Sequence, residues 1–204
     1  MTWANRITLG RLGIALACFL CLAAAGPDDV RLVDVATGFF LLGAVTDFLD
    51  GYLARRWGEE TAFGRMADPL VDKILVCGTL VMLLGFDAAR PFLPPWAVVV
   101  VILREFVVQG IRSLIEGGGV PFGASFWGKQ KMVIQCVATT ALLLQMSHPG
   151  LGLSGPESLR WAEGFLTALV ALMVFATLAS GAGYLVAARR LLARAASPEP
   201  KNRG

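Results

Sequence analysis

Six apolar segments, each close to the length of a membrane-spanning helix, constrain this chain more than any other feature. A helix that crosses a bilayer needs about 20 predominantly apolar residues. The segments span 8–25, 33–54, 66–86, 94–115, 124–146 and 162–188. Turn signals rich in Gly, Pro and Asp separate them, for example Gly26-Pro27-Asp28-Asp29. Only 16% of the residues are charged, against roughly a quarter in a soluble domain. The sequence therefore predicts an all-α membrane protein, a bundle of six transmembrane helices.

Basic residues gather at one set of segment ends. That set holds Arg6, Arg11, Arg55, Arg56, Arg65, Arg112, Lys129, Lys131, Arg189, Arg190 and Arg194. The opposite set holds little beyond Arg31, Arg90 and Arg160. Because Lys and Arg accumulate in cytoplasmic loops, the basic ends and both termini are expected on the cytoplasmic side of the inner (cytoplasmic) cell membrane.

The two ends of the chain differ in character. In the stretch Met1–Arg11, apolar Trp3, Ile7 and Leu9 lie near basic residues, which predicts a short amphipathic helix in the membrane interface, with a frayed terminus as the alternative. Residues 1–194 are expected to form one transmembrane domain. The tail 195–204 is rich in Pro and polar residues and is predicted to be disordered.

Charge and cysteine usage argue against several classes of partner. The net charge of +3 is modest, and the basic residues do not alternate with aromatics, so a nucleic-acid partner is not expected. Cys18 and Cys21 form a C-x-x-C pair, and Cys77 and Cys136 lie in other apolar segments, but neither a second pair nor a nearby His completes a metal site. The cysteines are interpreted as packing residues.

Four aspartates inside apolar segments form two pairs with helical spacing. Asp47 and Asp50 are three residues apart, which separates their side chains by only about 60° around a helix axis. Asp68 and Asp72 are four apart, with an offset of about 40°. The turn between the two segments is short, so both pairs are expected near the same side of the membrane.

Carboxylates in an apolar helix need a positive partner, because even one ionised residue at the helix centre costs a few kcal/mol. Ligation by oxygen alone suits a hard divalent cation, Mg²⁺ or Mn²⁺, and the absence of His or Cys from these positions argues against zinc. Four carboxylates can hold two such ions, which can neutralise charge during displacement at phosphorus. Gly51 permits a close approach to the helix. Arg55 is placed to contact a phosphate or to balance the acids, with a purely topological role for Arg55 and Arg56 as the alternative.

Further residues stand at fixed offsets from the aspartates. The order is Asp47-x-x-Asp50-Gly51-x-x-Ala54-Arg55, eight residues, Gly64, three residues, Asp68, three residues, Asp72. This arrangement resembles the signature of the CDP-alcohol phosphatidyltransferase family at every defined position. Eight specified positions over 26 residues make a chance match rare.

The resemblance implies a role for each matching residue. Asp47, Asp50 and Asp68 would bind metal, and Asp72 would contribute to metal binding and act as the catalytic base. Gly51 and Arg55 would hold the CDP group, with Thr61 and Gly64 as further candidates. CDP-diacylglycerol is the implied phosphatidyl donor, and the surrounding membrane lipids are the implied environment.

Shorter motifs outside this signature resemble those of the family's bacterial phosphatidylglycerophosphate synthases. They comprise Asn5-x-x-Thr8-x-x-Arg11, Arg104-Glu105-Phe106 with Arg112, and Gly128-Lys129-x-Lys131 with Gln135. The basic residues of the fourth and fifth segments lie in or near their cytoplasmic halves, where a phosphate would offset their desolvation. Arg104, Arg112, Lys129 and Lys131 are therefore predicted to bind the phosphate of the acceptor, glycerol 3-phosphate.

Several alternatives stay open at this point. A cardiolipin synthase, or another family member with a different acceptor, would share the aspartate signature. For any acceptor, the alternative for Lys129 and Lys131 is that they only orient their segment, and the alternative for Glu105 is that it only pairs with a neighbouring base. A cation-binding membrane transporter also uses paired aspartates, but it does not explain Gly51 and Arg55. Oligomeric state is not determined, and a homodimer is compatible with the sequence.

Overall fold

Six helices form the regular structure of the protein. The computed structural model describes residues 3–26, 29–57, 62–117, 126–149 and 156–196. The helices are α1 (Trp3–Ala24), α2 (Val30–Trp57), α3 (Ala62–Leu83), α4 (Pro95–Gly117), α5 (Phe126–Ser147) and α6 (Pro156–Ala196). No strand occurs within these ranges, so the prediction of an all-α bundle of six helices is confirmed for the described chain.

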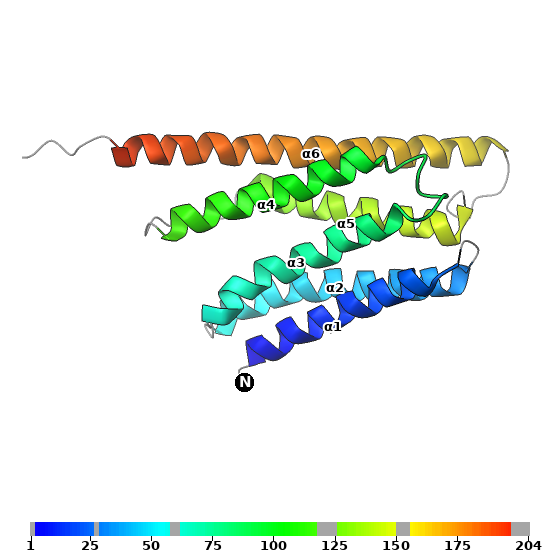
Figure 1. The fold of residues 1–204 in the computed structure, drawn as a ribbon, viewed down its shortest axis with the longest axis horizontal. Helices are drawn as coiled ribbons and strands as arrows, with labels where there is room; N and C mark the ends of the chain where they lie inside the picture. Colours follow the sequence, from blue (N-terminus) through cyan, green and yellow to red (C-terminus); the bar gives the residue numbers. More distant parts are fainter. Residues whose placement is uncertain (1–2, 27–28, 58–61, 118–125, 150–155, 197–204) are drawn as a thin grey trace, which may run out of the picture.

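Consecutive helices run in opposite directions along the bundle (Figure 1). The start of α1, the ends of α2 and α4 and the end of α6 consequently lie at one end of the molecule (Figure 1). α1 packs against α2 and α3, α5 packs against α2, α3 and α6, and α4 packs against α3 and α6. The segment ends that carry most of the basic residues thus share one end of the bundle, as the sequence predicts for their backbone positions.

Local signals explain where several helices begin. The side chain of Asp29 accepts a hydrogen bond from the backbone N–H of Leu32 at 3.2 Å, which is the geometry of an N-cap for α2. Pro95 and Pro156 occupy the first positions of α4 and α6, where a missing N–H leaves no helical bond unmade. Glu157 in the first turn of α6 suits the positive end of the helix dipole.

The structure differs from the sequence prediction at two helix ends. Over the described residues 3–11 there is no separate interfacial helix, because α1 continues without a break from Trp3 to Ala24 and Arg11 is buried at 7% exposure. α6 extends beyond 162–188 at both ends and has 41 residues. Its last residues are mainly Ala, Leu and Arg, the best helix formers, so the helix reaches Ala196. Residues 197–204 of the predicted tail lie outside the described part of the chain.

Two glycines allow α3 to lie close to its neighbours. A Cβ atom on Gly78 of α3 would stand 2.3 Å from the ring of Phe19 on α1. A Cβ atom on Gly43 of α2 would stand 2.6 Å from the side chain of Leu75 on α3. The described core therefore depends on small residues where helices approach, which is the usual packing of helices in membranes.

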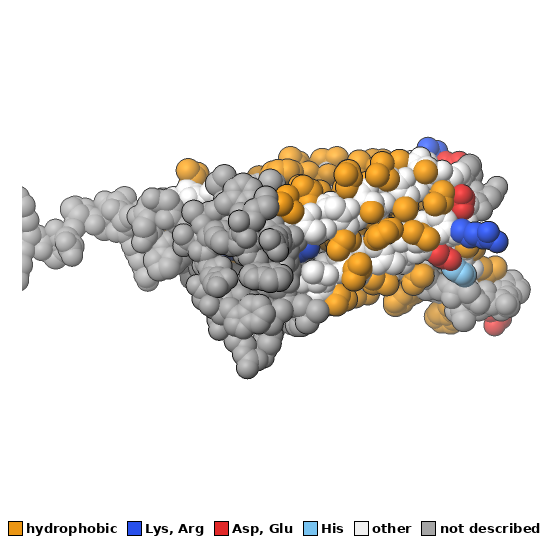
Figure 2. Space-filling model, turned by 90° about the horizontal axis from the view of Figure 1, so that it is seen from below, with side chains coloured by type: hydrophobic (Ala, Val, Ile, Leu, Met, Phe, Trp, Pro, Cys, Tyr) orange, Lys and Arg blue, Asp and Glu red, His pale blue; other side chains and the backbone are white. Residues whose placement is uncertain are grey.

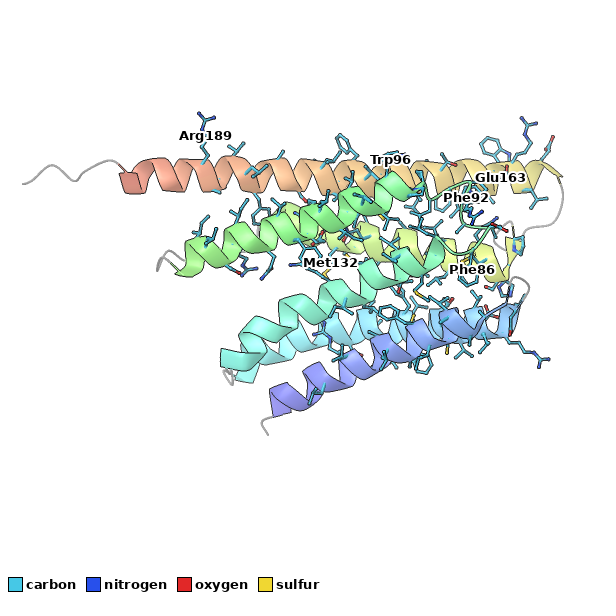
Figure 3. The ribbon with its side chains drawn as sticks, viewed as in Figure 1. Phe86, Phe92, Trp96, Met132, Glu163 and Arg189 are labelled. Carbon is cyan, nitrogen blue, oxygen red and sulfur yellow. The ribbon has the colours of Figure 1, made fainter. Side chains whose placement is uncertain are left out.

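Apolar side chains cover much of the outer surface. Leu114, Trp161 and Phe175 are at least 70% exposed, and each of the six helices carries further large hydrophobic residues that are exposed to a lesser degree. Figure 2 shows hydrophobic side chains across the described part of one face, with most of its visible charged side chains gathered at the end of the bundle where α2 begins and α3 ends (compare Figure 1). Phe86, Phe92 and Glu163 lie toward this end, and Arg189 lies toward the other (Figure 3).

One described helix is long and apolar enough by itself to cross a membrane, at Leu159–Arg189 of α6. Leu9–Ala24 and Lys73–Leu83 are shorter apolar stretches. Such an apolar exterior is unusual for a soluble monomer, which rarely exposes large contiguous apolar patches. The membrane character of the protein is therefore supported most directly by α6.

Candidate functional site

The two aspartate pairs lie on adjacent antiparallel helices near one end of the bundle. α2 ends at Trp57 and α3 begins at Ala62, so Asp47 and Asp72 are each ten residues, about 15 Å, from these helix ends. Asp50 and Asp68 are about 9–11 Å from them. The backbone thus places the pairs at matching levels on helices that contact each other.

The side chains of this region lie outside the described part of the structure, as do those of several other predicted site residues. This group comprises Asp47, Asp50, Arg55, Asp68, Asp72, Asn5, Thr8 and Lys129, together with all of Thr61. Gly51 and Gly64 are placed only as members of α2 and α3. Among the described side chains, no three of His, Cys, Asp and Glu gather as a metal site. The four-carboxylate ligand set therefore remains a prediction from the sequence.

A buried polar cluster connects α4, α5 and α6 and contains two of the predicted acceptor residues. Its centre is Glu105, at 4% exposure. Arg104 Nη1 donates to the two carboxylate oxygens of Glu105 at 3.3 and 3.4 Å, and Lys131 Nζ donates to Oε1. We call Arg104, Glu105, Lys131, Gln135, Thr177 and Ser180 the Glu105 cluster.

Gln135 and Thr177 extend the Glu105 cluster from α5 to α6. Gln135 Nε2 lies 3.5 Å from Glu105 Oε1 and donates to Thr177 Oγ1 at 3.2 Å. The Thr177 hydroxyl in turn donates to the backbone carbonyl of Met173 at 2.7 Å. In the described chain α4 and α5 make no close backbone approach, and the side chains of Lys131 and Gln135 on α5 reach Glu105 on α4 instead.

The guanidinium of Arg104 is held from several directions. Nη2 donates to Ser180 Oγ on α6 at 2.6 Å, and the guanidinium carbon lies 5.6 Å from the centre of the Tyr184 ring. The side chain is only 9% exposed. Its Nε has no hydrogen-bond partner, and it is the one buried side-chain nitrogen or oxygen of the described residues in this condition.

Charge in the Glu105 cluster is not balanced by its own members. Arg104 and Lys131 are two cations facing the single carboxylate of Glu105, so a net positive charge is buried there. A buried donor without a partner, like Arg104 Nε, is unfavourable unless a ligand such as water or an ion accepts its hydrogen bond. An anion with several oxygen acceptors would satisfy both the charge and the unmade hydrogen bond.

The remaining basic candidates lie nearer the ends of their helices. Arg112 is eight residues after Arg104, about 12 Å further along α4, and its side chain is half-buried. Arg11 is buried on α1. The described contacts bring Arg104 and Lys131 together through Glu105, and they do not place Arg112 or Arg11 in the same cluster.

Most of the sequence matches one known protein family. The sequence profile of the CDP-alcohol phosphatidyltransferase family matches residues 1–179. The chain belongs to this family. It is an enzyme of the phosphatidyl-transferring type, and the expectation drawn from the aspartate signature is confirmed at the level of the family.

Curated relatives show which members of the family this chain resembles. The chain is 36% identical to a CDP-diacylglycerol–glycerol-3-phosphate 3-phosphatidyltransferase of Bacillus subtilis over 149 residues, which are 69% of this chain and 75% of that protein. It is 33% identical to the protein of the same name from Rickettsia felis over 139 residues, 67% of this chain and 74% of that protein. A probable phosphatidylglycerophosphate synthase of Mycobacterium tuberculosis is 35% identical over 147 residues, 72% and 68% of the two chains.

Sequence reasoning missed several residues of this phosphatidyltransferase that the structure brings to the site. Ser180, Thr177 and Tyr184 all come from α6 and contact residues of α4 or α5. The available signal was the presence of polar residues in an otherwise apolar helix, since such residues in membrane helices usually face a partner. The pairing of Glu105 with a neighbouring base, left as an alternative by the sequence, is observed.

Proposed function

We propose that the protein transfers the phosphatidyl group of CDP-diacylglycerol to glycerol 3-phosphate, giving phosphatidylglycerophosphate and CMP. The names of the curated relatives support this reaction. The observation that carries the choice of acceptor is the buried, unpartnered Nε of Arg104 within a cluster of net positive charge. A phosphate monoester supplies the charge and the acceptor oxygens that this cluster lacks.

Arg104 and Lys131 are the proposed phosphate-binding residues. Nη1 of Arg104 donates to Glu105 and Nη2 donates to Ser180, so Nε is the nitrogen of this guanidinium that has no partner and can donate to an incoming oxygen. Lys131 shares its Glu105 partner with Arg104, and its ammonium group has three donors, which allows a second acceptor. Arg112 and Lys129, nearer the cytoplasmic ends of their helices, would attract the anion toward this site.

The donor set of the aspartate region fits a hard divalent cation. Asp47, Asp50, Asp68 and Asp72 offer oxygen ligands only, and their backbone levels match across α2 and α3. Two ions, Mg²⁺ or Mn²⁺, would neutralise the diphosphate of the donor when bound. Gly51, Arg55, Thr61 and Gly64 would hold the cytidine nucleotide beside them.

The transfer step is a displacement at phosphorus. A hydroxyl oxygen of glycerol 3-phosphate forms a bond to the phosphorus that carries the diacylglycerol. The bond from this phosphorus to the bridging oxygen breaks, and CMP leaves with that oxygen. The proton of the attacking hydroxyl goes to the carboxylate of Asp72, the proposed general base.

The bundle is proposed to cross the cell membrane six times with both termini in the cytoplasm. The start of α1, the end of α2, the start of α3 and the end of α6 lie at the end of the bundle that is rich in basic residues, which favours a cytoplasmic location for this end (Figure 1). Glycerol 3-phosphate is water-soluble, whereas the lipid part of the donor needs the bilayer. A site at this end of a membrane bundle gives access to both.

One measurement tests the proposed reaction against its rivals. The purified protein is incubated in detergent micelles with CDP-diacylglycerol, Mg²⁺ and one alcohol at a time, and CMP release is followed. Release with glycerol 3-phosphate alone is expected. Release only with phosphatidylglycerol would instead assign a cardiolipin synthase, and no release with any alcohol would favour a cation-binding transporter.

The base is tested separately by Asp72→Asn. This change keeps the size of the side chain and removes its capacity to take a proton, so turnover is expected to be abolished while most CDP-lipid binding is retained. Retained turnover would exclude Asp72 as the base.

A further inference from the structure

We propose that Ser180 of α6 is a positioning residue for the acceptor, because it fixes the guanidinium of Arg104 in the orientation that leaves Nε available to the acceptor phosphate. The inference rests on the proposed function, in which Arg104 binds that phosphate. It adds a residue that lies outside the aspartate signature and just beyond residue 179, where the match to the family ends.

The hydrogen bonds of Ser180 determine its chemical role. Its hydroxyl donates to the backbone carbonyl of Thr177 at 3.2 Å and accepts from Arg104 Nη2 at 2.6 Å. A hydroxyl has one proton to donate and two lone pairs. With its proton directed at the carbonyl, Ser180 presents lone pairs to Arg104, and at 2% exposure no bulk water competes for them.

Two helices together fix the plane of the guanidinium. Glu105, the next residue on α4, receives Nη1, and Ser180 on α6 receives Nη2. The guanidinium is planar and rigid, so fixing both terminal nitrogens also fixes the direction of the Nε–H bond. Without Ser180, the described contacts of the Arg104 head group would be those with its sequence neighbour Glu105 and with the Tyr184 ring, which leave the head group freer to rotate.

The residue after Ser180 supports the same interpretation. A Cβ atom on Gly181 would stand 3.1 Å from Arg104 Cγ, closer than ordinary van der Waals contact. Gly181 therefore leaves room for the stem of Arg104 while Ser180 holds its head. The Ser180-Gly181 pair forms a seat for this side chain on α6.

The test uses the full-length protein in mixed micelles and measures CMP release at varied glycerol 3-phosphate and, separately, at varied CDP-diacylglycerol. Ser180→Ala is expected to raise KM for glycerol 3-phosphate about tenfold, as for loss of one hydrogen bond to a charged group. KM for CDP-diacylglycerol should stay within about twofold, because in the described chain α6 packs against α4 and α5, whereas the proposed nucleotide-binding residues belong to α2, α3 and the segment between them.

Two further variants test whether the effect on KM depends on the Ser180 hydroxyl. Ser180→Thr keeps the hydroxyl and should bring KM for glycerol 3-phosphate back to within about threefold of the parent. Thr167→Ala is the matched control, because this exposed hydroxyl on α6 bonds the carbonyl of Glu163 in its own helix and should leave both KM values unchanged.

The outcomes separate the inference from the proposed function. A parent that releases no CMP with glycerol 3-phosphate overturns both. An active parent whose Ser180→Ala variant keeps the parental KM for glycerol 3-phosphate, or raises both KM values alike, overturns the positioning role alone. If Ser180→Ala does not fold, Gly181→Ala is measured in its place: a rise confined to KM for glycerol 3-phosphate supports the seat, and parental values overturn it.

Discussion

Replacing Glu105 with Gln is expected to destabilise the folded protein, because one carboxylate faces two buried cations. The side chains of Glu105, Lys131 and Arg104 are 5%, 6% and 9% exposed. Removing one partner of a buried ion pair costs about 3–5 kcal/mol, since the remaining charge is left without compensation. The amide oxygen of Gln can still accept a hydrogen bond, which places the expected loss at about 3 kcal/mol.

Thermal unfolding of the detergent-solubilised protein without substrate measures this loss. For a chain of about 200 residues, each kcal/mol changes Tm by roughly 2–4 °C, so Glu105→Gln should lower Tm by about 6–12 °C. Asp87→Asn is the control. Asp87 pairs with Arg90 at 2.7 Å, but its side chain is 87% exposed. Such a pair contributes under about 1 kcal/mol, so the control should unfold close to the parent.

A second substitution tests the cause of the loss. Lys131→Met has a similar volume and removes one of the two cations, so in the Glu105→Gln background it should recover part of the lost stability. The coupling between the two sites is expected to be at least about 1 kcal/mol, as for residues in direct contact. A Glu105→Gln variant that unfolds within about 2 °C of the parent, or strictly additive losses in the double variant, would refute the role of Glu105 as the common counter-ion.

Three other predictions concern the contact between α1 and α3, the role of Arg104 and the metal requirement. Gly78→Ala should destabilise the protein by about 1–3 kcal/mol through overpacking against Phe19, whereas Gly38→Ala, with nothing within 4 Å of its Cβ, should be neutral or stabilising; equal melting temperatures would contradict the close approach. Arg104→Lys keeps the charge but loses the planar fork, so KM for glycerol 3-phosphate should rise about tenfold in steady-state assays, and an unchanged KM would count against Arg104. Chelation by EDTA should stop CMP release and added Mg²⁺ or Mn²⁺ should restore it; activity that survives exhaustive chelation would remove the metal from the proposal.

The fold could be predicted from the sequence because its determinants are local. Apolar segments of bilayer-spanning length and turn signals between them gave the number and order of the helices. The exact ends depended on finer effects, such as the Asp29 side chain that begins α2 three residues before the apolar segment. The burial of Arg11 within an unbroken α1 depended on packing against the bundle, which no local signal reports.

The candidate site, like the fold, could be predicted from the sequence only where its determinants are local. Helical spacing was sufficient to place the two aspartate pairs on one face each, because neighbours three or four residues apart share a face. The Glu105 cluster could be predicted only in part, because Lys131 is 26 residues from Glu105 and Ser180 is 76 residues from Arg104. Contacts over such separations depend on which helices become neighbours, and a single sequence does not specify that.

A contact between α3 and α4 connects the two halves of the proposed site. Lys73 directly follows Asp72, and its Nζ donates to Gln109 Oε1 on α4 at 2.7 Å. Gln109 lies five residues after Arg104, about 7.5 Å along the same helix. The helix that carries the proposed base and the helix that carries the proposed phosphate-binding arginine are thus joined close to both residues. Because a misplacement of about 1 Å can cost a hundredfold in rate, this connection would, in the proposed reaction, help to keep the acceptor hydroxyl within reach of Asp72 while Arg104 binds the phosphate.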